Sequence, residues 1–301
     1  MMAPAIRNWF GRGEGITVPA IAATETNATA NTPTLPDSIA AEISSLWPIE
    51  RMGVTDSLWG DGFLFPGGAL ETMRLAKPLG LSAASSLLLL GAGAGGPACT
   101  VASKLGVWVA GFEADPDLVN SASERIIRSK LGRRAQVETW DPGNPEFRPR
   151  YYHHGLALEP LRGSAPEPTL SALALALKPG GQLSMVELVA TAPLEMSDPT
   201  VARWSQLENR DPAMLPSEVA ITRVLGRLGF DVRIVEDITQ RHMQQALLGW
   251  RTSVRGMEDD KPSPHMAKLL IGEAELWLMR LRLLRSGRLR MVRWHAIGRG
   301  A

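Results

Sequence analysis

A short apolar run that leads straight into a glycine-rich loop is the feature of this chain that most restricts how it can fold. Residues 87–90 read LLLL, and residues 91–96 read GAGAGG. We expect a helix to begin at about Pro97, so the loop would join the end of a strand to the start of a helix. Such a loop lets a ligand approach bare backbone, and the helix N-terminus offers unpaired N–H groups and the positive end of a dipole. The pattern predicts a ligand site at the carboxyl end of a strand.

Short apolar runs alternate with helical stretches over most of the chain. This alternation predicts an α/β fold, a doubly wound and mostly parallel sheet with helices on both faces. Pro48 is expected to end a helix, residues 178–181 to form a turn, and the His153–His154 pair to lie where a strand begins, with His153 before it. The expected strands are residues 87–90, 107–113, 135–140, 154–158, 182–189, 230–238 and 288–298. The expected helices are residues 39–47, 69–77, 97–105, 116–129, 169–177, 216–228, 241–254 and 265–285.

The chain is expected to divide into a flexible tail, residues 1–38, and one domain, residues 39–301. Residues 21–36 read IAATETNATANTPTLP, a nearly uncharged stretch that cannot bury enough apolar area to offset its ordering entropy.

Residues 1–15 hold an aromatic and basic segment, IRNWFGRGEG. One interpretation is a frayed terminus. The other is a docking segment for a partner protein or a membrane surface, since aromatic and basic side chains together suit either.

Charge and cysteine content exclude several classes of function. The sequence has 32 Lys and Arg against 31 Asp and Glu, a net charge of +1, which gives no reason to expect nucleic acid as a partner. The single cysteine, Cys99, excludes an internal disulfide and a thiolate zinc cluster, and no residue cluster has the spacing of a metal site. No window reaches the roughly 18 apolar residues of a membrane span, and no signal peptide is evident. We therefore expect a cytoplasmic protein with no metal and no transmembrane segment.

An acidic residue at the end of the second expected strand indicates what the glycine loop binds. Glu113 ends the run at residues 107–113. An acid in this position can accept hydrogen bonds from both hydroxyls of a ribose. A loop of this kind would also suit NAD, so the loop and the acid by themselves leave the cofactor open.

Three stretches, LLLLGAGAGGPA, VAGFEADPDLVNSA and LKPGGQL, resemble successive motifs of class I S-adenosylmethionine-dependent methyltransferases. The resemblance implies S-adenosyl-L-methionine as the cofactor. It also implies that the domain has a cofactor-binding core at residues 86–190 and helical lid and acceptor elements at residues 39–85 and 190–228. The implied cofactor-binding residues are Gly91, Ala92, Gly93 and Gly95 for the methionine part, Glu113 and Ala114 for the ribose, and Trp140 and Asp141 near the adenine. The third stretch implies a structural turn with no chemical role.

Two further segments, residues 56–72 and 228–239, resemble the phosphoethanolamine and sarcosine/dimethylglycine N-methyltransferases, so the resemblance covers about residues 47–255. This sequence departs from that pattern in three places. Leu89 stands where the family has an acid in its first strand. Trp47 or a neighbour stands where the phosphoethanolamine enzymes have a catalytic tyrosine. The end of the fourth expected strand offers only Glu159 and Arg162 as polar groups.

Methyl transfer is an in-line displacement for which positioning supplies most of the rate, and a base is needed only if the acceptor loses a proton. Glu159 and His242 are the candidate catalytic residues. Glu159 could instead form a structural ion pair, and His242 could instead be packed or capping. The candidate acceptor-binding residues are Trp59, Phe63, Phe65 and Trp204, whose rings could hold a cationic amine or could simply pack in a lid.

The sequence therefore predicts methyl transfer from S-adenosyl-L-methionine to a small polar or amphipathic acceptor. The alternative is a methyltransferase-like protein that no longer catalyses and serves as a binding or scaffold module.

Overall fold

The computed structural model describes residues 46–259 and 261–299. The expected tail, the docking segment and most of the expected helix at 39–47 lie outside these residues. Leu46 and Trp47, the last residues of that expected helix, are not helical. None of the described helices is both long and apolar enough to cross a membrane.

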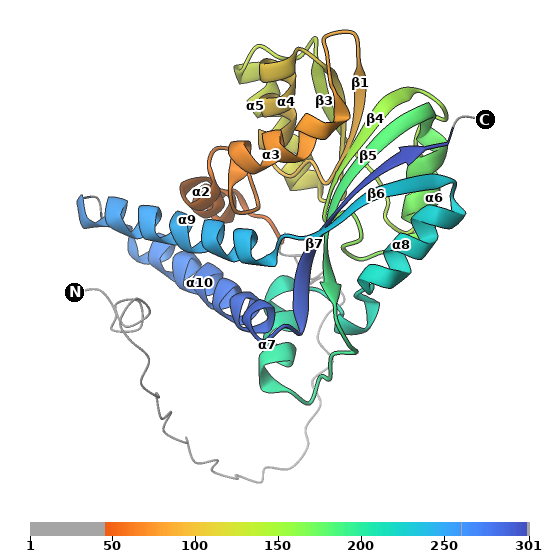
Figure 1. Cartoon of the computed structure of the whole chain (residues 1–301). Helices are drawn as coiled ribbons and strands as arrows, with labels where there is room; N and C mark the ends of the chain where they lie inside the picture. The colour runs from red at the N-terminus through yellow and green to blue at the C-terminus, as the bar shows by residue number, and fades with distance from the viewer. Residues whose placement is uncertain (1–45, 260, 300–301) are drawn as a thin grey trace, which may run out of the picture. The chain divides into compact units, whose positions relative to one another are not determined.

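A seven-stranded sheet in the order β3-β2-β1-β4-β5-β7-β6 forms the centre of the molecule (Figure 1). The first five strands are parallel to one another, and β7 runs antiparallel to both β5 and β6. The strand order reverses between β1 and β4, the place where α/β sheets of this kind bind ligands. The predicted mostly parallel α/β fold is confirmed. The strands are β1 Ser86–Leu90, β2 Trp108–Glu113, β3 Ala135–Thr139, β4 Tyr152–Leu158, β5 Leu177–Ala190, β6 Phe230–Asp237 and β7 Leu289–Gly298.

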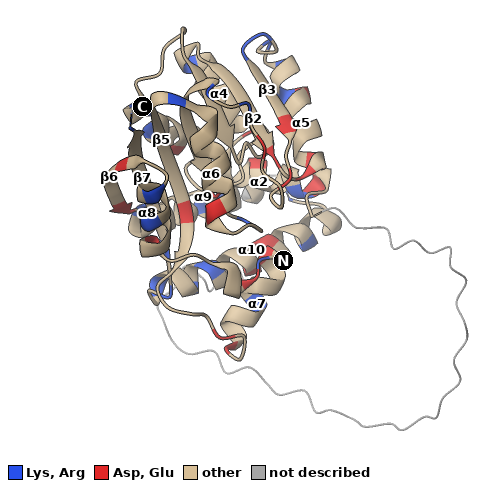
Figure 2. Cartoon of the chain, turned by 90° about the vertical axis from the view of Figure 1, so that its right-hand side faces the viewer, with Lys and Arg blue, Asp and Glu red and all other residues tan. Residues whose placement is uncertain are grey.

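Helices cover both faces of the sheet (Figure 1). Helices α3, α4 and α5 pack on one face, and α6 and α8 on the other. Figure 2 shows Lys and Arg interspersed with Asp and Glu along the ribbon, which agrees with the near-zero net charge. The helices are α2 Ile49–Trp59, α3 Gly68–Ala76, α4 Gly96–Leu105, α5 Pro116–Arg128, α6 Pro166–Ala176, α7 Pro199–Glu208, α8 Glu218–Arg227, α9 Thr239–Asp259 and α10 Pro264–Arg285; short 3-10 turns follow at η2 Lys77–Leu79 and η3 Pro212–Met214.

Strand β1 is apolar on both sides because both of its faces are buried. Leu87 and Leu89 belong to the core beneath α4 and α5, and Leu88 and Leu90 belong to the core beneath α6 and α8. Successive side chains of a strand point to opposite faces, so a central parallel strand reads as an unbroken apolar run. This explains the LLLL stretch, and it places Leu89, the residue that departs from the resembled motif, in the core.

Two helices, α2 and α7, were not predicted from the sequence. Pro48, which was expected to end a helix, precedes one instead. It is the N-cap of α2, with extended backbone immediately before Ile49. Helix α7 lies within the expected lid at residues 190–228, where no helix was predicted before 216. Asp198 caps α7 by accepting hydrogen bonds from the backbone N–H groups of Thr200 and Val201.

Two strands begin earlier than the sequence indicated. Strand β4 starts at Tyr152, two residues before the expected start at residue 154, so His153 also lies within the strand. Strand β5 starts at Leu177, so the expected turn at 178–181 is part of the strand. Pairing of Tyr152 with Leu177 at a register shift extends both strands in this way.

Candidate functional site

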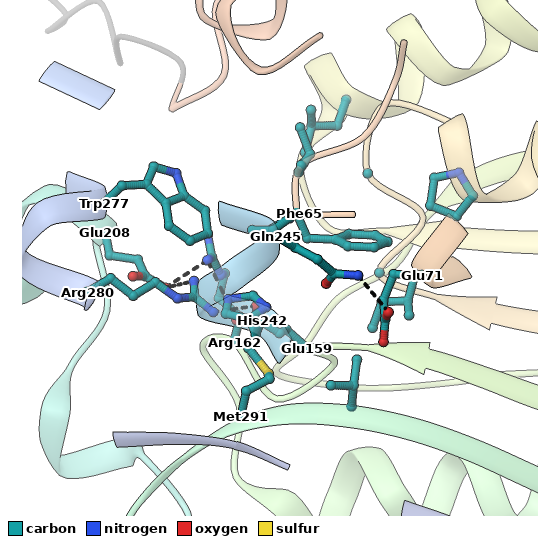
Figure 3. A pocket seen from close by; sticks show the side chains of 18 of the residues that line it. Phe65, Glu71, Glu159, Arg162, Glu208, His242, Gln245, Trp277, Arg280 and Met291 are labelled. Atoms are coloured by element: carbon teal, nitrogen blue, oxygen red, sulfur yellow. Dashed lines mark hydrogen bonds and ion pairs between the residues drawn. The ribbon is translucent and has the colours of Figure 1, made fainter. Parts of the chain in front are cut away.

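A cavity of about 160 Å³ lies at the carboxyl ends of β1, β2 and β4, the predicted position. The segment between α2 and α3, together with α9 and α10, also contributes to its wall (Figure 3). The predicted site residues that line it are Gly91, Gly93, Glu113, Ala114, Glu159, His242 and Phe65. The predicted site residues that do not line it are Ala92, Gly95, Trp140, Asp141, Trp59, Phe63 and Trp204.

Glu113 lies directly against the glycine loop. The backbone N–H of Gly93 donates to its Oε2 and that of Ala114 to its Oε1, both at 2.8 Å. Burial raises the pKa of Glu113, while the backbone N–H donors act in the opposite direction. The carboxylate is therefore held at the junction of β1 and β2, facing the cavity that both loops line.

Gly91 allows the glycine loop to pass over the end of β4. Its φ is +77°, and a Cβ built on it would lie 2.1 Å from the carbonyl oxygen of Leu158. Only glycine fits this position, because any side chain would overlap backbone that has nowhere to move. The close approach keeps the first turn of the loop free of side chains.

Arg125 ties the segment between α2 and α3 to the glycine loop, and the sequence analysis missed it. Its Nη2 lies 3.0 Å from Oδ2 of Asp56 and 2.8 Å from Oδ1 of Asp61, and its Nη1 donates to the carbonyl oxygen of Ala94. Arg125 is buried on the same face of α5 as Leu118. An arginine at an apolar-face position of an amphipathic helix was the available signal.

A buried charge cluster lies where β4 ends. We use this name for Glu159, Arg162, Glu187, Glu208, Arg210 and Arg280. Arg280 bridges Glu159 and Glu208 at 2.6 and 2.9 Å. Arg210 bridges Glu159 and Glu187 at 3.1 and 2.7 Å. Three arginines thus balance three glutamates, which is what burial of charge requires.

The ion pairs of the buried charge cluster make Glu159 a poor proton acceptor. Burial alone would raise its pKa, but Arg280, Arg162 and Arg210 together hold the pKa well below its ordinary value. Its backbone has a φ of +46°, the left-handed region that non-glycine residues rarely adopt. The geometry favours the ion-pairing role that the sequence left open for Glu159.

Trp204 supports the buried charge cluster from within the core. Its side chain is fully buried, and its Nε1 donates to Oε2 of Glu208 at 2.5 Å. It therefore does not reach the cavity, and the expectation that it binds the acceptor does not fit its position.

His242, in the first turn of α9, lines the cavity. Its ring lies 5.8 Å from that of Trp277, between centroids, and its Nε2 is buried without a hydrogen-bond partner among the described residues. Burial and the nearby Arg280 lower its pKa to about 3, although Glu159 acts in the opposite direction. The imidazole is therefore neutral and has an uncommitted nitrogen.

The other predicted aromatic residues mostly pack against one another. Trp59 packs on Trp277, with ring centroids 4.9 Å apart, and Phe63 packs edge-on against Phe65 at 5.9 Å. Phe65 thus reaches the cavity, and the two others support its wall.

Trp140 and Asp141, which were expected near the adenine, contact other residues of the chain. Trp140 is buried and packs on Phe147 at 5.8 Å, and Oδ1 of Asp141 accepts from the backbone N–H of Gly143 at 2.8 Å. Within residues 46–259 and 261–299, no group of three or more His, Cys, Asp or Glu side chains could hold a metal ion.

No family model and no curated protein sequence matches this chain. Solved structures do match it. One is Haemonchus contortus phosphoethanolamine N-methyltransferase 2 in complex with phosphomonomethylethanolamine and S-adenosylhomocysteine, with a TM-score of 0.70 and 21% identity over 82% of this chain. This chain spans 57% of the length of that protein.

Two other structures extend the comparison. A protein from Galdieria sulphuraria described as a sarcosine dimethylglycine methyltransferase has a TM-score of 0.67 and 14% identity, and the match covers 83% of this chain and 98% of that one. The [4+2]-cyclase SpnF has a TM-score of 0.58 and 19% identity, with 77% and 81% covered.

The fold is that of class I S-adenosylmethionine-dependent methyltransferases, and the structural neighbours include the small-molecule N-methyltransferases that the sequence motifs resemble. Because a cyclase shares the fold, the fold alone does not set the reaction.

Proposed function

We propose that this protein binds S-adenosyl-L-methionine and transfers its methyl group to a small acceptor held in the same cavity. The observation that carries the proposal is the Glu113 carboxylate at the end of β2, fixed against the glycine loop that follows β1, the strand at which the strand order reverses. A carboxylate in this place can accept from two ribose hydroxyls. The positive φ of Gly91 and Gly93 leaves bare backbone next to it, which suits the remainder of the cofactor.

The bound cofactor would supply an electrophilic methyl carbon on a positively charged sulfur. The residues of this chain would supply binding, orientation and exclusion of water. Glu113 and Gly93 would orient the cofactor, and Phe65 would close the wall on the acceptor side. Arg125 would keep the segment that carries Phe65 attached to the glycine loop.

Calorimetry with S-adenosylhomocysteine and with NAD tests the cofactor. We expect the first to bind and the second not to bind. Glu113→Ala should weaken S-adenosylhomocysteine binding by about 1.5–3 kcal/mol, the usual contribution of hydrogen bonds to a charged group. Glu138→Ala is the matched control, because Glu138 is exposed on the neighbouring strand β3. Tight NAD binding without a response to S-adenosylhomocysteine would overturn the proposal.

A cofactor-consumption screen over small amines, phenols and lipid precursors tests the reaction. Turnover with any small acceptor should disappear in Glu113→Ala in parallel with the loss of cofactor binding. Methylation of RNA or protein alone would contradict the small-acceptor part of the proposal.

A non-catalytic binding or scaffold module is the second candidate. Two observations favour it: Leu89 is buried in the core where related enzymes have an acid, and the polar groups at the end of β4 are engaged with one another. Under this alternative, purified protein should bind no S-adenosylhomocysteine at millimolar concentration, and Glu113→Ala should leave its cellular phenotype unchanged.

A further inference from the structure

One part of the sheet lacks a covering helix. Residues 140–151, which connect β3 to β4, are all described, and none of them is helical. A connection between parallel strands usually contains a helix that covers the sheet, as α4 and α5 do after β1 and β2. Phe147 in the helix-free connection packs on Phe112 and Trp140, which lie at the carboxyl ends of β2 and β3. At the amino ends of the same two strands, Trp108 and Gln136 remain exposed.

A groove of about 500 Å³ lies at this uncovered place, along the amino ends of β1, β2, β3 and β4. Two large aromatic side chains line it, Trp108 and Tyr151, which are 49% and 45% exposed. Among the described residues, none lines both this groove and the cavity at the carboxyl ends of the strands. The groove is therefore separate from the candidate cofactor site.

The groove has a positive charge that no acid balances. Its cationic residues are Arg133, Arg134, Arg150 and Lys178. None of the described lining residues is Asp or Glu, and none of the four cations forms an ion pair within the described part of the chain. Glu138 lies farther along β3 and does not line the groove. The connection between α5 and β3, which holds the first two arginines, is blue in Figure 2. Unmatched like charges around one groove repel each other, and a bound anion would relieve this repulsion.

The cations of the groove lie beside its aromatic rings. Cζ of Arg134 is 4.4 Å from the ring centroid of Trp108, and Cζ of Arg148 is 4.0 Å from that of Tyr151. Arg134 also donates to the carbonyl oxygen of Gly106 at 2.9 Å, which fixes its guanidinium on the ring. The groove thus offers flat aromatic surface and positive charge side by side.

A nucleotide combines the two properties that match this groove. An acidic peptide would match the cations and leave the rings exposed, and an uncharged aromatic compound would match only the rings. A nucleotide has a base that packs on aromatic side chains and phosphates that pair with cations. The groove has the volume of a small-molecule site, and the net charge of +1 gives little attraction for a long nucleic acid strand.

We propose that this groove binds a free nucleoside phosphate, with the base on the aromatic wall of Trp108 and Tyr151 and the phosphates among the four cations. The site lies at the opposite end of the strands from the cofactor cavity, and the inference does not depend on the methyl-transfer function.

Calorimetry with matched probes tests the inference. The probes are UDP, uridine, inorganic pyrophosphate and pentauridylate, because uracil does not resemble the adenine of the expected cofactor. Saturating S-adenosylhomocysteine is present to keep the probes out of the cofactor cavity. We expect UDP to bind at least about tenfold more tightly than uridine or pyrophosphate, since only UDP contacts both the rings and the cations.

Two variants separate the two parts of the site. Trp108→Leu keeps an apolar side chain over the sheet and removes the ring, so UDP affinity should fall at least about fivefold while pyrophosphate affinity stays within about twofold. Arg133→Gln removes one exposed cation that has no partner among the described residues, so the affinities for UDP and pyrophosphate should both fall about fivefold. Arg223→Gln is the matched control, because Arg223 is an exposed and unpaired arginine on α8, and it should change neither affinity.

Four results would overturn the inference. They are no UDP binding at millimolar concentration, UDP binding no tighter than pyrophosphate, unchanged UDP affinity in Trp108→Leu, and an equal effect of Arg133→Gln and Arg223→Gln. Pentauridylate that binds more than about tenfold more tightly than UDP would identify the ligand as a nucleic acid strand and would also contradict the proposal. Thermal unfolding of each variant shows whether it is folded, and Arg133→Gln, on an exposed side chain, keeps the test valid if Trp108→Leu unfolds.

Discussion

Arg210→Met tests whether the buried charge cluster is held together by charge balance. Arg210 is buried and bridges Glu159 at 3.1 Å and Glu187 at 2.7 Å, and Glu187 is 0% exposed. Removing it leaves three glutamates opposed by two arginines, so one buried negative charge loses its counterion. Breaking a buried pair from one side typically costs 3–5 kcal/mol, so we expect a loss of about 4 kcal/mol in the free energy of unfolding at pH 7.5. In a protein of this size that corresponds to a fall of about 8–16 °C in Tm.

The pH dependence of that loss follows from the pKa of Glu187. In the native protein, burial raises the pKa of Glu187 and Arg210 offsets part of that rise. The substitution of Arg210 therefore raises the pKa of Glu187 further. An acid whose folded pKa exceeds its unfolded pKa destabilises the fold increasingly as pH rises from the unfolded to the folded value. Glu159, whose pKa is lowered partly by Arg210, loses stabilisation that is fully present above its ordinary pKa, so its contribution is nearly the same at pH 5 and pH 7.5 and the difference between the two comes from Glu187. The variant should therefore lie closer to wild type at pH 5 than at pH 7.5.

Urea denaturation followed by tryptophan fluorescence measures both effects, with a constant m-value as the check on two-state unfolding. Arg227→Met is the matched control, since its ion pair with Glu167 has the similar distance of 2.8 Å but both side chains are more than half exposed. It should change stability by less than about 1 kcal/mol. Adding Glu187→Gln to Arg210→Met restores neutrality and should regain about 1–3 kcal/mol. A loss below about 1 kcal/mol for Arg210→Met, an equal loss at both pH values, or no regain in the double variant would refute the reasoning.

Three further substitutions test the cofactor side of the site. Arg125→Met removes the ion pairs to Asp56 and Asp61 and leaves the backbone hydrogen bond from Gly96 N–H to the Gly62 carbonyl oxygen as a link between this segment and the glycine loop. It should weaken S-adenosylhomocysteine binding about tenfold in calorimetry, the effect of one lost charged contact; unchanged affinity would contradict a role for Arg125 in holding the segment. Gly91→Ala forces a Cβ to within 2.1 Å of backbone and should cost more than about 2 kcal/mol in urea denaturation, whereas Gly132→Ala, with nothing within 4 Å, should be near neutral. Asp115→Ala removes the cap of α5 and should cost about 1 kcal/mol in thermal unfolding; a change within error would mean that the cap is dispensable.

Local signals explain why parts of the site could be predicted. The helix expected from residue 116 begins where Asp115 accepts from N–H groups two and three residues away, and the turn at Gly91 depends on the conformational freedom of one residue. Helix α2 lacked such a signal, because it contains Gly53 and the β-branched Val54 and Thr55, which favour helix weakly. Burial of Val54 and Leu58 against the rest of the protein stabilises that helix, and burial is decided by tertiary structure.

The sequence by itself determined the order of the seven strands, most of the helices between them, the position of the glycine loop and the acid that faces it, since each depends on periodicity or on contacts within a few residues. Only the tertiary structure decided what the remaining polar residues do. Glu159 and Arg280 lie far apart in the sequence, and the fold alone brings their side chains to 2.6 Å. Packing against elements distant in the sequence also buried Trp204 away from the cavity and left Nε2 of His242 buried without a hydrogen-bond partner among the described residues. Whether a charged or polar side chain is paired, buried or free depends on which elements the topology brings together, and no pattern within one segment records this.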